Sequence, residues 1–213
     1  MNMKRESEQR YENNMTGEKQ RYMITGFSTV CTAIDRALEI AGRMGQVNVA
    51  LDGMCGSGKT TLGEALAGKY ECNLFHMDDF FLRTQQRTAK RFEEPGGNVD
   101  YERFRSEVLD HLADEEGFSY RRFDCHTMKL EEAYQLSRQR LNIIEGAYSC
   151  HPYFGDIYSL RFFMEISVRE QQRRILARNG EAVYRRFEHE WIPMENRYFE
   201  FYGIREKCFV LTC

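Results

Sequence analysis

The chain contains a glycine-rich loop with the pattern G-x-x-x-x-G-K-[ST], which runs from Gly53 to Thr60 and constrains the fold more than any other feature. An apolar run at 47–51 precedes the loop and predicts a strand, and the run at 60–67 that follows predicts a helix. Glycines let successive backbone N–H groups curl around an anion, and a helix N-terminus adds partial positive charge. This context therefore predicts a strand–loop–helix unit that holds the phosphates of a nucleotide.

Two side chains of this loop have expected chemical roles. Lys59 can reach the β- and γ-phosphates and neutralise the charge that develops during phosphoryl transfer, and the Thr60 hydroxyl can ligate Mg²⁺. The other predicted nucleotide-binding residues are Gly53, Cys55, Gly56, Ser57, Gly58 and Thr61. For the Cys55 side chain a small loop residue is the preferred interpretation, and an oxidation-sensitive thiol is the alternative.

The composition is that of an ordered globular protein. The 213 residues, 42% of them hydrophobic, suffice for one domain, or for one domain with a small lid. A formal net charge of −3 provides no basic field that would attract nucleic acid. Seven cysteines without a C-x-x-C pair indicate neither a disulfide framework nor a zinc site, and they favour reduced thiols in the cytoplasm. Because we find no secretory signal and no membrane-length apolar run, no membrane partner is expected.

Strand and helix patterns alternate along most of the chain. The predicted strands cover 46–51, 72–77, 118–123, 141–146, 160–166 and 208–212, and the predicted helices cover 28–42, 60–69, 101–113, 169–179 and 188–202. Residues 1–20 are rich in charge and predict a flexible tail, which leaves 21–213 as the phosphate-loop domain. We therefore expect an α/β protein with the three-layer α/β/α fold of P-loop NTP hydrolases, a mostly parallel sheet and a small arginine-bearing lid.

Acidic residues follow two of the predicted strands. Asp78 and Asp79 come after 72–77, and Glu145 lies at the end of 141–146. Ligands of such sheets bind beyond the carboxyl ends of the strands, so these acids are expected beside the phosphate loop. One of the two aspartates is expected to face the site and accept the proton of an acceptor hydroxyl, while the other caps a helix or loop. Glu145 is expected near Mg²⁺, with a salt bridge or cap as the alternative.

A run of arginines occupies the predicted helix 169–179. Arg169, Arg173 and Arg174 share a face, and Arg178 follows Arg174 at a spacing of four residues. Such a helix could close over the phosphates as a lid, which would span about 169–190 and exclude water. A solvated charged face is the alternative interpretation.

These motifs together resemble the uridine kinase family of P-loop kinases, whose relatives include nicotinamide riboside kinase, pantothenate kinase and phosphoribulokinase. The resemblance spans about 46–212 and consists of the loop at 53–61, Met77-Asp78-Asp79-Phe80-Phe81, Gly96-Gly97-Asn98-Val99-Asp100, Glu145-Gly146 and the arginine helix. It implies that Asp78 is the catalytic base for a 5′-hydroxyl and that Glu145 lies near Mg²⁺. It also implies that Phe81 lines the nucleoside pocket and that Asp100 holds the ribose.

The resemblance further assigns the lid arginines and the contacts to the base. Arg173 and Arg178 are expected to stabilise the transferred phosphoryl group, and Arg174 to contact the substrate. The family's Y-D-F-x-x-H-x-R stretch is present only as Phe123-Asp124-Cys125-His126-Thr127-Met128-Lys129. Phe123 and His126 are therefore the expected base contacts, and the loss of the tyrosine hydroxyl leaves the choice of base open.

The expected activity is transfer of the γ-phosphoryl of ATP (or GTP), with Mg²⁺, to a small alcohol, first of all the 5′-hydroxyl of uridine or cytidine. Nicotinamide riboside, pantothenate or a sugar-like acceptor are alternatives with the same chemistry. A nucleotide-binding regulatory module is a third, less favoured hypothesis. The sequence leaves the oligomeric state open, a homo-oligomer included.

Overall fold

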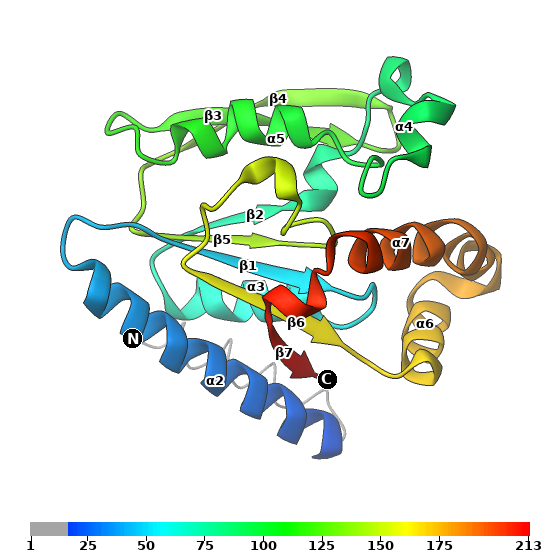
Figure 1. Ribbon diagram of the computed structural model, residues 1–213, viewed down its shortest axis with the longest axis horizontal. Coiled ribbons are helices and arrows are strands. Elements are labelled where there is room, and N and C mark those ends of the chain that lie inside the picture. Colours follow the sequence, from blue (N-terminus) through cyan, green and yellow to red (C-terminus); the bar gives the residue numbers. More distant parts are fainter. Residues whose placement is uncertain (1–16) are drawn as a thin grey trace.

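Residues 17–213 are described by the computed structural model, with side chains from residue 26 onward. Within this range five strands form one sheet in the order β2-β5-β1-β6-β7, and every neighbouring pair is parallel (Figure 1). The strands are β1 (Val47–Gly53), β2 (Asn73–His76), β5 (Leu141–Glu145), β6 (Leu160–Glu165) and β7 (Phe209–Thr212). β1 lies in the middle, so the glycine-rich loop that follows it starts at the centre of the sheet edge.

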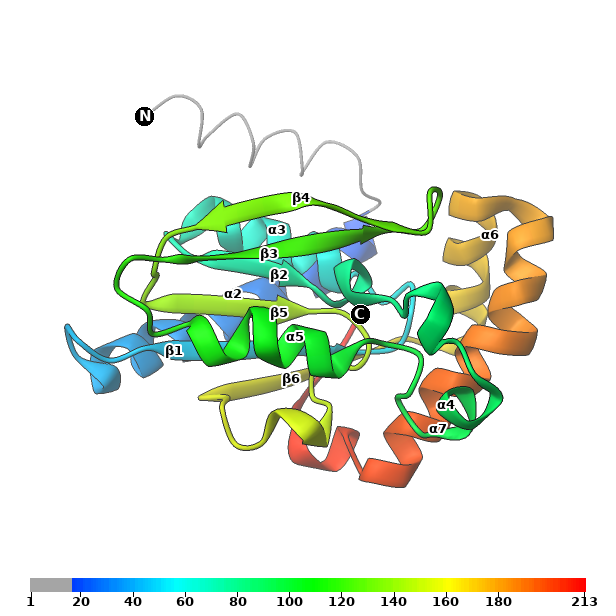
Figure 2. The ribbon, with the colours of Figure 1, turned by 90° about the horizontal axis from the view of Figure 1, so that it is seen from above.

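Helices cover both faces of this sheet (Figures 1 and 2). α2 (Gly17–Ala41) and α3 (Lys59–Lys69) lie on one face. The short α5 (Tyr101–Glu107) lies on the other, together with a two-stranded antiparallel ribbon of β3 (Phe118–Asp124) and β4 (Lys129–Leu136). The remaining helices are α4 (Ala89–Glu93), α6 (Val168–Arg186) and α7 (Ile192–Tyr202). α6 and α7 lie beyond the ends toward which the strands run, next to the loop after β1.

The central strands are apolar because both of their faces are buried. Val49 and Leu51 of β1 belong to the core cluster that includes side chains of α2 and α3, whereas Ala50 belongs to the cluster on the opposite face. The same alternation separates Ile143 from Ile144 in β5. Apolar surface buried on each face holds the three layers together, because each Å² removed from water stabilises the fold by about 25 cal/mol. The predicted α/β class and parallel sheet are thus confirmed.

Two predicted elements differ from the structure, and one strand was not predicted. α2 begins at Gly17 and not near residue 28, so residues 17–20 of the predicted tail are helical, while 1–16 lie outside the described residues. The helix predicted over 101–113 ends at Glu107, where the backbone of Val108 leaves the helical region. β4 was missed because most of its side chains are exposed, which removes the alternation that marks a half-buried strand.

The predicted arginine helix belongs to a longer bent element. α6 continues to Arg186, but Gly180 inside it has φ 76° and ψ 170°, which breaks the helical path immediately after Asn179. A π-helical turn, Phe187–Trp191, then joins α6 to α7. The segment 169–190 therefore consists of two arms on either side of a glycine. Whether it closes as a lid stays a prediction. In the described part of the chain no helix combines the length and apolarity needed to cross a membrane.

Candidate active site

The glycine-rich loop adopts a conformation that only glycine tolerates at several positions. Gly53, Gly56 and Gly58 have φ of 126°, 75° and 100°. A Cβ on Gly53 would lie 2.2 Å from the carbonyl oxygen of Met164 on the neighbouring strand. The loop is therefore both curled and pressed against β6, and the N-terminus of α3 follows directly from it.

Lys59, the first residue of α3, is folded back over the loop. Its buried ammonium donates hydrogen bonds to the carbonyl oxygens of Gly53 at 2.7 Å and Met54 at 2.9 Å. These contacts keep the side chain on the side of the loop where a phosphate chain would lie. An anion would offer the ammonium a stronger, charge-assisted hydrogen bond than these neutral carbonyls do.

A cluster of three polar side chains lies at the start of α3. Glu145, at the end of β5, accepts a hydrogen bond from the Thr60 hydroxyl, with distances of 3.1 and 3.2 Å to its two oxygens. His76, at the end of β2, places Nδ1 2.5 Å from Glu145 Oε1. This contact raises the pKa of His76 above its ordinary value. His76 was missed in the sequence, although it is a polar residue at a strand end beside the aspartate pair.

The hydroxyl and carboxylate oxygens of Thr60 and Glu145 are hard ligands of the kind that Mg²⁺ prefers. Among the described residues no group of three or more His, Cys, Asp or Glu side chains is arranged to hold a metal ion. A magnesium ion here would therefore depend on phosphate oxygens and water for most of its ligands, as is usual where Mg²⁺ accompanies a nucleotide.

The aspartate pair divides its side chains between two environments. Both residues lie in a 3₁₀ turn, Met77–Phe80, and not on a strand. Asp79 accepts a hydrogen bond from the Tyr120 hydroxyl at 3.1 Å and pairs with Arg122 at 3.4 Å, which ties the turn to β3. Asp78 lines the cavity beside the phosphate loop. Its removal from bulk water, and then the Glu145 carboxylate, raise the pKa of Asp78 above its ordinary value.

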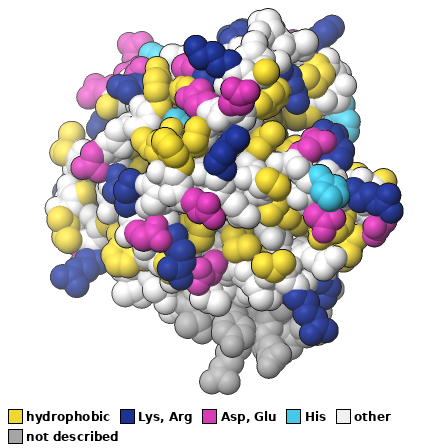
Figure 3. Space-filling model, turned by 45° about the vertical axis from the view of Figure 1, so that its right-hand side comes forward, with side chains coloured by type: hydrophobic (Ala, Val, Ile, Leu, Met, Phe, Trp, Pro, Cys, Tyr) yellow, Lys and Arg dark blue, Asp and Glu magenta, His cyan; other side chains and the backbone are white. Residues whose placement is uncertain are grey.

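The cavity at this edge has a volume of about 1480 Å³. Its floor is the phosphate loop, and Glu145 and Asp78 line it nearby. Phe81, Asn98 and His126 also line the cavity, as do Arg87 and Met128. Pockets for one small ligand commonly measure about 300–1,000 Å³, so this cavity has room for two. On the side of the molecule turned forward in Figure 3, positive and negative side chains are interspersed, with no single-sign field.

The three arginines predicted to contact substrates all line the cavity, but two of them are engaged with a carboxylate. Arg173 and Arg174 both pair with Glu170 at 2.6 Å, and these contacts lower the pKa of Glu170 to about 2. Arg174 also donates to the carbonyl oxygens of Gly56 and Ser57 at 3.2 and 3.3 Å. Arg178 donates to the Asn179 side chain, at 2.8 Å. Arg174 thus supports the phosphate loop.

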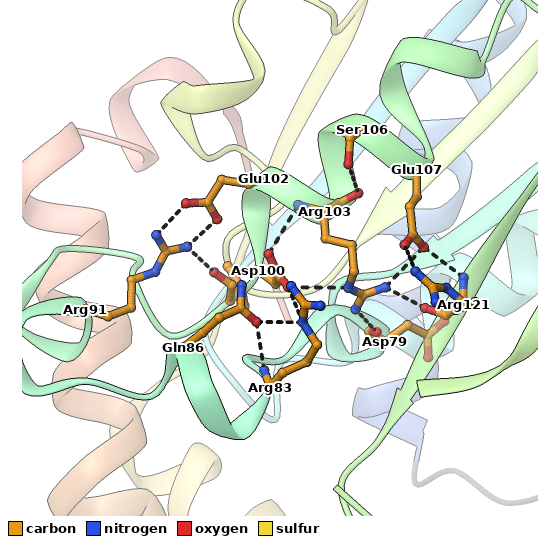
Figure 4. Close-up of polar contacts among 11 residues, drawn as sticks. Asp79, Arg83, Gln86, Arg91, Asp100, Glu102, Arg103, Ser106, Glu107 and Arg121 are labelled. Carbon is orange, nitrogen blue, oxygen red and sulfur yellow. Dashed lines mark hydrogen bonds and ion pairs between the residues drawn. The ribbon is translucent and has the colours of Figure 1, made fainter. Parts of the chain in front are cut away.

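Four predicted site residues do not line the cavity. Two of them, Gly53 and Ser57, are buried residues of the loop itself. Asp100 is buried and caps α5, where its Oδ1 accepts the Arg103 N–H at 3.2 Å (Figure 4). Its other oxygen lies 3.6 Å from Arg83 Nε and 3.5 Å from Arg103 Nε. Asp100 therefore organises the scaffold below the site, and Asn98 faces the cavity in its place.

Phe123 does not line the cavity either. It is buried at a point where β3 shifts its register against β4, between Arg121 and Phe123. The turn that follows does reach the cavity through His126. Asp124 holds this turn, since its carboxylate accepts the His126 N–H at 2.7 Å and the Thr127 hydroxyl at 2.9 Å.

Cys55 behaves as a small loop residue. Its thiol is buried, and burial raises its pKa, so it stays protonated near neutral pH. Its carbonyl oxygen and sulfur both accept from Gln171 Nε2, at 3.0 and 3.2 Å. All seven cysteines are free thiols.

A buried aspartate supports the loop from below. Asp52 is fully buried and accepts hydrogen bonds from the N–H groups of Gly53 at 2.7 Å and Cys150 at 2.9 Å, and from the Tyr198 hydroxyl at 2.9 Å. It thereby ties the end of β1 to α7. Burial raises the pKa of Asp52 above its ordinary value.

The Tyr198→Phe change should lower the free energy of unfolding by about 1–2 kcal/mol, because it removes one hydrogen bond from a buried carboxyl group and leaves the ring in place. Urea denaturation would measure the effect. Tyr202→Phe, on the same helix, is the matched control. Equal stability losses in the two variants would contradict a specific role for the Asp52 contact.

Comparison with known proteins supports the fold. A family model for shikimate kinase matches residues 55–119, less than a third of the chain. No curated protein matches the sequence significantly. Among solved structures, a possible uridine kinase from Bacillus stearothermophilus superposes with a TM-score of 0.65 and 17% identity, over 91% of this chain and 99% of that chain.

A second solved structure, a proposed fructose transport system kinase from Silicibacter sp. TM1040, superposes with a TM-score of 0.66 and 21% identity, over 88% of this chain and 98% of that chain. At these identities the likeness establishes the fold. The chain thus has the fold of these two solved proteins, and the resemblance expected from the sequence is confirmed at the level of the fold.

Proposed function

We propose that this protein is a phosphotransferase that moves the γ-phosphoryl group of ATP, with Mg²⁺, to the hydroxyl of a small molecule. The observation that carries the proposal is the convergence of the Lys59 ammonium, the Thr60–Glu145 pair and the Asp78 carboxylate on one cavity with room for two ligands. Phosphoryl transfer requires charge neutralisation and an oriented nucleophile, and these groups can supply both. A donor such as GTP would meet the same loop.

For the acceptor we propose the 5′-hydroxyl of uridine or cytidine. Phe81 and His126 line the cavity with Asp78, which supports an aromatic base and a nearby sugar hydroxyl. A second candidate is an acceptor that carries an anionic group, such as pantothenate. It is favoured by Arg87, an exposed cavity-lining guanidinium for which no carboxylate partner is found among the described residues. Nicotinamide riboside and sugar-like alcohols remain further candidates.

A screen for acceptor-stimulated ADP release tests the proposal. The purified protein, with ATP and Mg²⁺, is given nucleosides, vitamins and sugars one at a time, and the phosphorylated product is identified by mass spectrometry. We expect one class of alcohol to raise ADP release well above the rate without acceptor. If no alcohol stimulates ADP release but a protein partner does, the nucleotide-binding regulatory module replaces the kinase.

The Glu145→Gln variant should need about tenfold or more Mg²⁺ for half-maximal activity, because loss of a carboxylate beside a metal site weakens metal affinity by about that factor. Activity is measured against Mg²⁺ concentration at saturating ATP. The exposed Glu64→Gln on α3 provides the control and should leave the curve unchanged. An unchanged curve for Glu145→Gln would remove Glu145 from the magnesium site and leave it as a partner of His76.

A further inference from the structure

A carboxylate from outside the phosphate-loop motif is seated on the loop. Glu195, in the first turn of α7, is only 8% exposed, and its Oε2 accepts the backbone N–H of Cys55 at 2.9 Å. It also lines the cavity that contains Lys59. The N–H groups of such loops are the donors that bind phosphate oxygens. Glu195 is therefore, besides Glu145, a second carboxylate at the loop where a nucleotide's phosphates would bind.

The titratable groups that act most strongly on Glu195 come from β1, the phosphate loop and α3. From the start of α3 comes Lys59, whose positive charge favours the ionised carboxylate, and from β1 comes Asp52, whose carboxyl disfavours it. The Cys55 thiol and amide lie against it, and the charge of Glu195 also acts on the Tyr148 hydroxyl. Burial outweighs the Lys59 charge and raises the pKa of Glu195 to about 7.

We propose that Glu195 is a positioning residue that holds the Cys55 amide in the empty loop and takes up a proton from solvent when a nucleoside triphosphate binds. The inference rests on the proposed nucleotide-binding function. Lys59 can compensate one negative group in the buried space beside the loop. An incoming phosphate chain and an ionised Glu195 are two negative groups, and they repel each other. Protonation removes the repulsion and keeps the side chain in place, because a neutral carboxyl still accepts the Cys55 N–H through its carbonyl oxygen.

The coupling has a defined sign. The bound phosphates make the proton on Glu195 harder to remove, so the pKa of Glu195 is higher in the complex than in the free protein. Nucleotide affinity is then insensitive to Glu195 at pH values well below 7 and falls as pH rises above that value. The fall approaches tenfold per pH unit at its steepest, since one proton is taken up for each nucleotide bound. A side chain that is only structural would change affinity equally at all pH values.

The test measures the dissociation constant of a non-hydrolysable ATP analogue with Mg²⁺ by titration calorimetry, from about pH 6 to pH 8.5. Wild type, Glu195→Gln and Glu200→Gln are compared; Glu200 is an exposed glutamate on the same helix. We expect the wild type and Glu200→Gln to lose about tenfold more affinity over this range than Glu195→Gln, in which the neutral amide cannot titrate. In the wild type, heats in two buffers of different ionisation enthalpy should show proton uptake near pH 7.5.

Two results would overturn the proposal and are distinguishable from each other. If the wild type binds the analogue without proton uptake, or with the same pH profile as Glu195→Gln, Glu195 is only structural and the kinase proposal stands. If the analogue does not bind at any pH, the nucleotide-binding function fails and the inference fails with it. The buffer comparison uses unaltered protein, so the test does not depend on how well Glu195→Gln folds.

Discussion

The Asp78→Asn variant should turn over its acceptor at least about a hundredfold more slowly than the wild type, while its affinity for ATP stays nearly unchanged. Asp78 lines the cavity beside the phosphate loop, and its raised pKa makes the ionised form a better proton acceptor. An amide of the same shape cannot accept the hydroxyl proton, and general base catalysis typically contributes about 10²–10⁴-fold. The measurement is kcat with the acceptor found in the screen, together with the dissociation constant of ATP.

Asp79→Asn is the matched control for this prediction. The neighbouring aspartate points to Tyr120 and Arg122 on β3, so its amide variant should lose some stability but keep kcat within a few-fold of the wild type. A normal rate in Asp78→Asn would end the assignment of Asp78 as the base. An equal loss in both variants would point to distortion of the 3₁₀ turn rather than to lost chemistry.

The pH dependence follows from the same assignment. A base must be ionised to act, so kcat should rise with pH on the acid side and level off above the pKa of Asp78. Because that pKa is raised by burial and by Glu145, the acid limb should lie at higher pH than for an ordinary aspartate. Glu145→Gln should shift this limb to lower pH, since it removes the neighbouring negative charge.

The parts of the site that could be predicted from sequence are those that local chemistry dictates. The Gly53–Thr60 loop requires glycines in conformations closed to other residues, and acids at the ends of parallel strands must meet at one edge. Topology alone therefore places Glu145 and the Asp78-Asp79 pair beside the loop, whereas the choice of Asp78 as the base comes from the family resemblance. The buried sheet could also be predicted, because strands that are covered on both faces consist of nearly continuous apolar residues.

The residues that could not be predicted depend on contacts between distant segments. Asp100 directly precedes the helix Tyr101–Glu107, and that position equally suits an N-cap, which is the role it has. Glu195 and Cys55 are 140 positions apart in the chain, and a single glutamate in a helix carries no signal of its partner. Only the packing of α7 against the loop brings them together.

The Lys59→Met variant should lose about a thousandfold in turnover and should also bind ATP more weakly. Cations that stabilise the transferred phosphoryl group contribute about 10³–10⁵ to the rate of phosphoryl transfer. Methionine keeps the apolar stem of the side chain and removes only the ammonium, whose present partners are the carbonyl oxygens of Gly53 and Met54. The Met54 carbonyl oxygen keeps a hydrogen bond from the Ser57 N–H at 3.1 Å, so the loop should stay folded.

The exposed Lys69→Met, at the other end of α3, tests whether the loss is specific. It removes the same charge from the same helix without touching the loop, and it should change turnover less than twofold. Thermal unfolding of both variants separates lost chemistry from lost structure. If Lys59→Met were folded and turned over ATP at a near-normal rate, the ammonium would not act on the phosphates. The glycine-rich loop at 53–60 would then be expected to bind a ligand other than a nucleotide.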